Sequence, residues 1–335
     1  MSCAAIVHNP TPFVADKFVL ADLAGNDVVL TVVSATFEAS SGTSLKVAEV
    51  QQPIALADAY FGDPRHSSVQ VESQLGLMKP CVDVIVRGNV HAPRGAAAST
   101  VHFGIAVGRM RKHLIACGDR TWTIGAGGRT PSAPQPFIAM PVVFERAFGG
   151  ADQSSCCPEN PVGVGYRTCR SADPAIRTEL PNIEYADSRM TRPSDTVRVA
   201  GTGSIARGWQ PRLAYAGTFD AAWLDRKWPL LPDDFDARHY QAAPHDQQFP
   251  DLPGGERIAL VNMTEDGAWH FDLPDVRLST RYRFDAGHDA QPLRLDTVLI
   301  EPEHRRVVMI WKNLQKMSRK RGLLHDIIVF RTRTA

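Results

Sequence analysis

The sequence predicts a mainly β protein with two antiparallel sheet-rich halves, each a sandwich or a distorted barrel, joined by long ordered irregular segments with few short helices. Three observations lead to this prediction. Short β-branched runs alternate with turn signals before Gly125, the same pattern returns after Gly255, and the stretch between them is rich in proline and glycine. The corresponding ranges are an N-terminal β-rich half at 1–124, an irregular region with a crossover at 125–255, and a C-terminal β-rich half with a basic tail at 256–335.

Two hairpins give the clearest strand signal in the N-terminal half. Residues 18–20 and 28–37 are β-branched or aromatic runs on either side of a Gly/Asn/Asp cluster, which is typical of a hairpin. The run 28–37 is apolar nearly throughout, so we expect it to be buried on both faces. Residues 100–107 alternate between apolar and small or polar side chains, and 111–118 supply the partner strand.

The C-terminal half carries five further strand signals separated by turn residues. We expect strands at 257–263, 269–273, 276–284, 294–301 and 307–311. The last apolar run, 323–330, fits one more strand or a short docking helix. Between these runs lies a basic cluster at 316–321, which we interpret as a solvated surface that can also steer an acidic partner.

The stretch 209–250 is unusual because it holds three of the six tryptophans, Trp209, Trp223 and Trp228, beside five prolines. Residues 221–227 fit a helix that Asp220 caps, and 231–236 reads as a turn. We interpret the stretch as a long structured crossover between the two halves, with an ordinary surface loop as the alternative. We expect the three tryptophans to be at least partly buried.

Composition limits the classes of partner. The 335 residues include 37 basic and 36 acidic side chains, which leave no net charge to hold nucleic acid or an anionic membrane across the whole surface. The first residues lack the pattern of a signal peptide, and no apolar run approaches the roughly 20 residues that span a bilayer. We therefore expect a cytoplasmic protein that does not insert into membranes and does not bind nucleic acid.

Standard catalytic and metal-binding signatures are missing from the sequence. Gly125, Ala126, Gly127 and Gly128 resemble a phosphate loop, but no lysine follows in register. The six cysteines show no CxxC spacing, so we interpret them as free thiols, and adjacent Cys156 and Cys157 with Cys169 make an awkward metal set. We expect no catalytic residues, no metal and no cofactor.

A few charged residues remain as candidates for a structural role or an interface. Glu145 and Arg146 lie between two phenylalanines, where an internal ion pair that pins irregular backbone competes with a binding role. The carboxylates of Asp233, Asp234 and Asp236 are better explained by turn formation than by a glycosidase pair or a calcium loop. His245 and Asp246 lie close to His239, but no activated serine or cysteine accompanies them.

Eight strings together resemble the bacterial domain-of-unknown-function family 2169, over roughly residues 10–312. They are Pro12-Phe13, 60–64 (YFGDP), 140–150 (MPVVFERAFGG), 160–163 (NPVG), 209–212 (WQPR), 230–236 (LLPDDFD), 242–247 (AAPHDQ) and 295–302 (LDTVLIEP). The chain departs from the usual pattern of the family at 154–171 and after Trp311.

The resemblance implies a role that the residues alone do not show. Members of this family accompany type VI secretion systems, where they are regarded as non-enzymatic adaptors or chaperones that load effectors onto the VgrG or PAAR spike. The implied partner is the N-terminal region of an effector, or a spike component. The alternative is a hydrolase, for example a carbohydrate-acting one, on a β scaffold. A scaffold with many turns and no reactive constellation favours binding.

Overall fold

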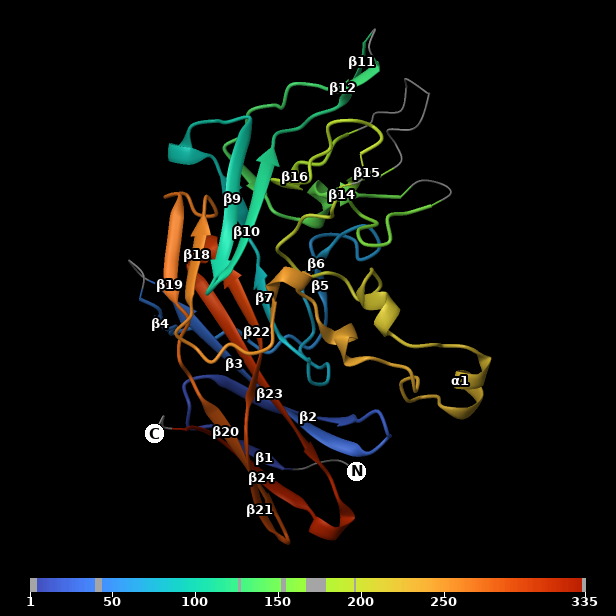
Figure 1. Ribbon diagram of the computed structural model, residues 1–335. Coiled ribbons are helices and arrows are strands. Elements are labelled where there is room, and N and C mark those ends of the chain that lie inside the picture. The colour runs from blue at the N-terminus through green and yellow to red at the C-terminus, as the bar shows by residue number, and fades with distance from the viewer. Residues whose placement is uncertain are drawn as a thin grey trace.

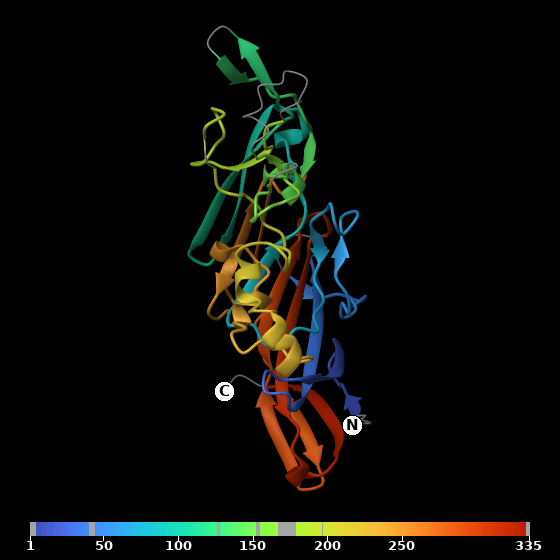
Figure 2. The ribbon, with the colours of Figure 1, turned by 90° about the vertical axis from the view of Figure 1, so that its right-hand side faces the viewer.

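The computed structural model describes residues 5–39, 44–125, 128–151, 155–166, 179–195 and 197–332. Three sheets make up most of the elongated body, and none of the described sheets closes into a barrel (Figures 1 and 2). The prediction of a mainly β fold is confirmed. No helix in these ranges is long and apolar enough to cross a membrane.

A seven-stranded sheet forms the centre of the molecule. Its order is β17 (Gln248–Phe249), β7 (Val82–Val86), β22 (Arg294–Glu301), β23 (Arg306–Lys316), β3 (Asp27–Glu38) and β2 (Val14–Ala21), with β4 (Lys46–Val47) also paired to β3.

Two further sheets pack against it. The five-stranded sheet runs β16 (Ile183–Tyr185), β10 (Met110–Cys117), β9 (Thr100–Val107), β18 (Arg257–Val261) and β19 (Ala268–Asp272). The four-stranded sheet runs β1 (Ile6–His8), β24 (Leu324–Arg331), β20 (Leu278–Phe284) and β21 (Gly287–Pro292). Of the two alternatives for the last apolar run, the strand is therefore the one observed.

Smaller elements complete the described chain. The two-stranded pairs are β5 (Ala59–Tyr60) with β6 (Val69–Val71), β8 (Asn89–His91) with β13 (Ala139–Pro141), β11 (Trp122–Gly125) with β12 (Gly128–Pro131), and β14 (Phe148–Gly149) with β15 (Val164–Gly165). The α-helix is α1 (Ala221–Arg226), and 3-10 turns lie at Pro93–Gly95, Phe144–Arg146, Arg212–Tyr215, Ala237–Tyr240, His245–Gln247, Pro302–His304 and Arg319–Arg321.

The main core lies between the seven-stranded and five-stranded sheets. In β9 the inward side chains Val101, Phe103, Ile105 and Val107 are all buried, as the alternation of apolar residues predicts. The strand β3 is buried on both faces, which confirms the expectation for 28–37. The four-stranded sheet covers the beginning of β3, so this strand lies at the junction of all three sheets.

The N-terminal and C-terminal strand-rich ranges do not form separate bodies. In the seven-stranded sheet β3 pairs with β23, and in the five-stranded sheet β9 pairs with β18. Strand signals in the sequence locate strands along the chain, but the two ranges interleave in space. The pairs β7–β22, β1–β24 and β14–β15 are parallel, whereas the other pairs of named strands in the described chain are antiparallel, as predicted.

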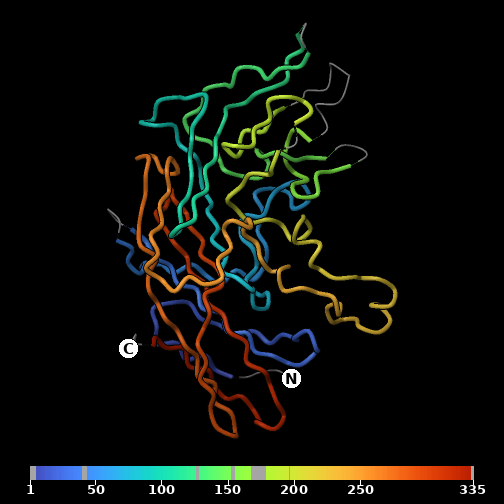
Figure 3. Tube along the Cα trace, viewed as in Figure 1, coloured from blue at the N-terminus to red at the C-terminus, as the bar shows by residue number. Residues whose placement is uncertain are grey.

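The crossover is ordered, and its middle part forms a projecting arm, which we define as residues 216–236 (Figure 3). Within the arm, α1 begins after Asp220, whose Oδ1 accepts the N–H of Trp223 at 2.8 Å, as the capping signal predicts. Leu230 lies against the turn between β2 and β3, where a Cβ on Gly25 would come within 2.9 Å of it. Gly25 also has a positive φ of 80°, which suits glycine.

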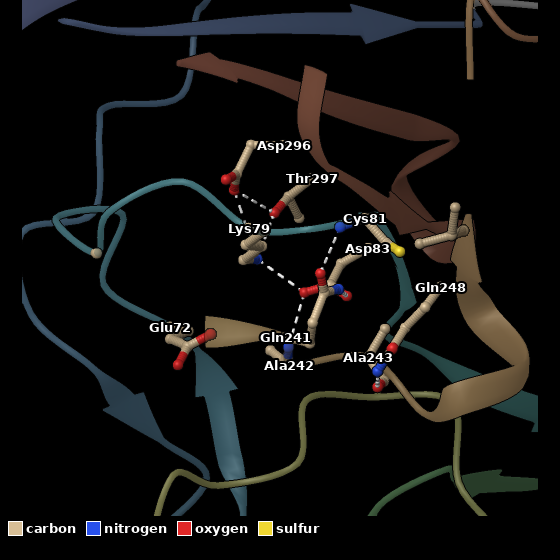
Figure 4. Close-up of polar contacts among 12 residues, drawn as sticks. Glu72, Lys79, Cys81, Asp83, Gln241, Ala242, Ala243, Gln248, Asp296 and Thr297 are labelled. Carbon is tan, nitrogen blue, oxygen red and sulfur yellow. Dashed lines mark hydrogen bonds and ion pairs between the residues drawn. The ribbon is translucent and has the colours of Figure 1, made fainter. Parts of the chain in front are cut away.

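Buried charges lie where the crossover returns to the central sheet (Figure 4). The Nζ of Lys79 lies 2.8 Å from Asp83 Oδ2 and 3.4 Å from Asp296 Oδ2, and Lys312 is also 3.4 Å from that oxygen. Burial opposes the charged form of Lys79, but the carboxylates of Asp296 and Asp83 outweigh it and raise the pKa of the amine. We refer to these four residues as the buried charge cluster.

Asp83 connects the buried charge cluster to the crossover. Its two carboxylate oxygens accept the Gln241 side-chain amide at 2.6 Å and the Ala242 N–H at 2.7 Å. Gln241 Oε1 in turn accepts the N–H of Cys81 at 2.6 Å. Because Asp83 is 0% exposed, a side chain that cannot accept these bonds leaves buried donors without partners.

We predict that Asp83→Leu lowers the free energy of unfolding by about 3–5 kcal/mol, because it leaves Lys79 and the Gln241 amide buried without their acceptor. Asp83→Asn, which keeps one acceptor oxygen, should lower it less. Urea titration followed by circular dichroism measures both. Asp16→Asn, on an exposed carboxylate of β2, is the control and should have little effect. Wild-type stability of Asp83→Leu would show that the buried charge cluster does not hold the crossover.

Candidate binding pocket

A pocket of about 700 Å³ opens where the irregular region meets the crossover. Its walls come from stretches far apart in the sequence: Phe144 and Phe148 on one, Pro211 on another, and His245 with Asp246 on a third. These stretches belong to three of the eight strings that carry the family resemblance. The fold therefore brings these three strings together at one site.

A buried asparagine fixes the phenylalanine wall. Asn160 is 0% exposed, and its side-chain amide donates to the carbonyl oxygens of Phe144 at 2.8 Å and Phe148 at 3.0 Å. Gly163 allows this close approach, because a Cβ there would lie 2.4 Å from Asn160 Nδ2. The irregular backbone thus has specific hydrogen-bond partners in place of a sheet.

Aromatic packing also holds the phenylalanine wall in place. The rings of Phe144 and Trp209 meet edge to face with centroids 5.6 Å apart. Gly201 lies under Phe144, and a Cβ there would be 2.5 Å from the ring. The pocket therefore has a rigid apolar floor.

Asp246 is the main charged group on the crossover side, and it is paired. Its Oδ1 lies 2.9 Å from the Nζ of Lys112, whose side chain is 0% exposed. Lys112 also donates to Gln247 Oε1 at 2.8 Å. Burial lowers the pKa of the Lys112 amine to about 8, although Asp246 acts in the opposite direction.

Tyr185 and Arg198 cover this ion pair. Burial, together with the negative charge of Asp246, raises the pKa of the Tyr185 hydroxyl to about 12. The Arg198 guanidinium lies over the Tyr185 ring, 4.1 Å from its centroid, and forms an ion pair with Asp187. The hydroxyl therefore stays protonated at neutral pH and can donate a hydrogen bond.

Several polar groups of the pocket are paired or held in their neutral form. Burial raises the pKa of the Cys157 thiol, which keeps this sulfur in its unreactive form. Asp246 and Arg198 each have a partner of opposite charge. An apolar cavity with a few fixed polar groups is the usual form of a ligand or peptide site.

A family model described as "Uncharacterized protein conserved in bacteria (DUF2169)" matches residues 24–312. The chain belongs to this family. No curated protein and no solved structure was found to match the chain.

In this DUF2169 chain, Glu145 and Arg146 do not form the internal ion pair with each other that the sequence suggested. Glu145 accepts the N–H and the hydroxyl of Ser68 at 2.6 and 2.7 Å. Arg146 donates to Asn182 at 3.2 Å and to Asp119 at 3.3 Å. Both belong to one 3-10 turn, where consecutive side chains point about 120° apart, so neighbours in sequence reach different partners.

The three aspartates of the arm contact nearby backbone and side chains. Asp234 accepts the N–H and hydroxyl of Thr218 at 2.9 and 2.7 Å, and these hydrogen bonds lower the pKa of its carboxyl. Asp236 accepts the N–H of Arg238 at 2.8 Å, and Asp233 pairs with Lys227. The first two arrangements are the turn chemistry that the sequence indicates.

The tryptophans differ from the expectation at one position. Trp209 is 7% exposed beneath the pocket, and half-buried Trp223 donates its indole N–H to the Leu230 carbonyl at 2.8 Å. Trp228 was expected to be at least partly buried between or beside the halves, but it is 66% exposed. The arm, which carries α1, projects away from the main body of the sheets (Figure 1).

The cysteines are only partly described. Cys81, Cys117, Cys156 and Cys157 are free thiols, whereas Cys3 and Cys169 lie outside the described residues. Among the described residues, no group of three or more His, Cys, Asp and Glu side chains is arranged to hold a metal ion.

Sequence reasoning missed Lys112, Tyr185 and Arg198. Lys112 lies between exposed Arg111 and His113, so the sequence alone suggests a surface lysine. The single available signal is that the strand pattern places residue 112 on the inward face together with Leu114. An inward lysine requires a partner, and only the fold shows that the partner is Asp246.

We predict a pH signature for Lys112. Its pKa falls from 10.5 to about 8 on folding, so between these values the unfolded chain binds more protons and stability rises with pH. The slope is at most about 1.4 kcal/mol per pH unit. The unfolding free energy of wild type minus that of Lys112→Met should therefore increase from pH 7.5 to 9.5 in urea titrations, because only wild type carries the amine. Lys46→Met, on exposed β4, is the control. A constant difference would contradict burial of the amine.

A second prediction concerns Arg146, whose side chain is 35% exposed. Arg146→Met removes the hydrogen bonds to Asn182 and Asp119, and it should lower the free energy of unfolding by about 0.5–1.5 kcal/mol. Thermal unfolding measures the loss. Unchanged stability together with loss of partner binding would instead identify Arg146 as part of an interface.

Proposed function

We propose that this chain is a non-enzymatic adaptor or chaperone that binds an effector of a type VI secretion system in the cytoplasm and helps to load it onto the VgrG or PAAR spike. The partner is the N-terminal region of the effector or a spike component. The resemblance to DUF2169 proteins supports the secretion context. The surface of the arm supports protein binding.

The exposed apolar side chains of the arm carry the proposal. Phe219, Leu224 and Trp228 are 54%, 63% and 66% exposed, although a protein in water usually avoids grouping such side chains. The three residues fall within ten positions of one another around α1. Trp residues of this kind are frequent binding hot spots.

The backbone of the arm holds these side chains in a fixed position. Asp234 ties the beginning of the arm to its end through Thr218, and the Asp236 N–H donates to the Tyr215 carbonyl at 3.0 Å. Phe219 and Trp223 stack edge to face with centroids 4.8 Å apart. A preorganised surface loses less conformational entropy on binding than a mobile loop.

The pocket adds a second supporting feature. Two of its charged groups, Asp246 and Arg198, are held in ion pairs, and the floor is apolar. An apolar cavity with fixed polar groups is a common form of a peptide site. We therefore expect the pocket to hold a segment of the bound partner.

We predict that the double substitution Leu224→Ser and Trp228→Ser weakens binding to the effector that wild type retains, among those encoded near the gene, at least tenfold, because it removes two exposed apolar contacts. Co-expression, pull-down and calorimetry of the purified pair measure the change. Asp225→Asn, exposed on the same helix, is the matched control and should bind as wild type does.

Two results would contradict the proposal. Wild-type affinity of the double variant would exclude the arm as the binding surface. Failure to retain any effector or spike component, combined with turnover of an offered polysaccharide or other polymer, would favour the hydrolase alternative.

A further inference from the structure

Two histidines meet on the solvent face of the five-stranded sheet. His102 lies on β9 and His113 on β10, and both are exposed. The Nδ1 of His102 is 3.0 Å from the Nε2 of His113, and the ring centroids are 5.1 Å apart. Within the described part of the chain, neither ring hydrogen-bonds to a carboxylate.

The strand register explains why the rings meet. His113 pairs directly with Gly104, and His102 precedes Gly104 by two residues on the same face. Gly104 has no side chain to separate the rings, and a Cβ there would lie 2.4 Å from the Lys112 carbonyl oxygen. The side chain of Asn262 donates to the His102 carbonyl at 2.8 Å and so holds this backbone in place.

The separation of the two nitrogens suits one metal ion. With metal–nitrogen bonds of about 2.05 Å, two ligand nitrogens are about 2.9 Å apart at a right angle and about 3.4 Å apart at the tetrahedral angle. The observed 3.0 Å falls between these values. This contact is a hydrogen bond in which one ring nitrogen donates and the other accepts. If the donor ring changes tautomer, its proton moves to its other nitrogen, and both facing nitrogens then offer lone pairs to an ion.

We propose that His102 Nδ1 and His113 Nε2 form a bidentate site for a first-row divalent cation that prefers imidazole, the class of Cu²⁺, Ni²⁺ and Zn²⁺. The protein supplies two ligands, and water fills the remaining positions, consistent with the absence of any three-residue metal group among the described residues. Such a site exchanges its ion, unlike a closed structural zinc site. The site lies outside the pocket and the arm and is independent of the adaptor role.

Calorimetric titration of the tag-free full chain with Ni²⁺ tests the site. We expect one saturable event with a stoichiometry of one. His102→Gln and His113→Gln should each weaken it at least tenfold, because each leaves a single imidazole. His270→Gln, exposed on β19 of the same sheet, is the matched control and should bind as wild type does. All three positions are exposed, and circular dichroism checks that the variants fold.

A second readout separates this pair from other histidines and from the thiols. Ni²⁺ should raise the melting temperature of wild type and His270→Gln but not of His102→Gln or His113→Gln, because the ion binds only the folded arrangement. No saturable Ni²⁺ binding by wild type would overturn the proposal. Equal affinity in wild type and both pair variants would overturn it as well.

Discussion

The carboxylates of Asp83 and Asp296, buried beside the amines of Lys79 and Lys312, govern how the irregular part of the chain attaches to the sheets. Opposite charges in a dry interior require one another, because either sign alone would be strongly destabilising. Asp83 stands in the central sheet and also accepts two donors from the crossover. The crossover therefore docks in one place, and its residues just after Ala242, including His245 and Asp246, take fixed positions.

The pocket depends on this docking and on a second kind of contact. Side chains hydrogen-bond the backbone groups that would otherwise have no partner. Without regular strands, the stretch around Phe144 and Phe148 relies on Asn160 to occupy its carbonyl oxygens. Asp246, which lines the pocket, then pairs with buried Lys112 of β10. Buried polar contacts of this kind place the walls accurately because each atom has few alternative partners.

The arm is stabilised differently from the body. It holds its shape by local hydrogen bonds, such as that between Thr218 and Asp234, and leaves apolar rings in water. The molecule thus combines a body fixed by burial with a projecting element whose apolar side chains are uncovered. This combination agrees with the proposed role, in which a stable scaffold presents a surface to another protein.

Local patterns in the sequence determined which segments are strands, that α1 begins after Asp220, and that Asp234 and Asp236 stabilise turns, because each depends on residues a few positions apart. The membership of the family also followed from short strings. Tertiary structure alone decided that β9 pairs with β18, that Lys112 meets Asp246, that Glu145 and Arg146 take different partners, and that Trp228 stays exposed. Those outcomes depend on which distant surfaces bury one another, and residues far apart along the chain leave no joint pattern in one sequence.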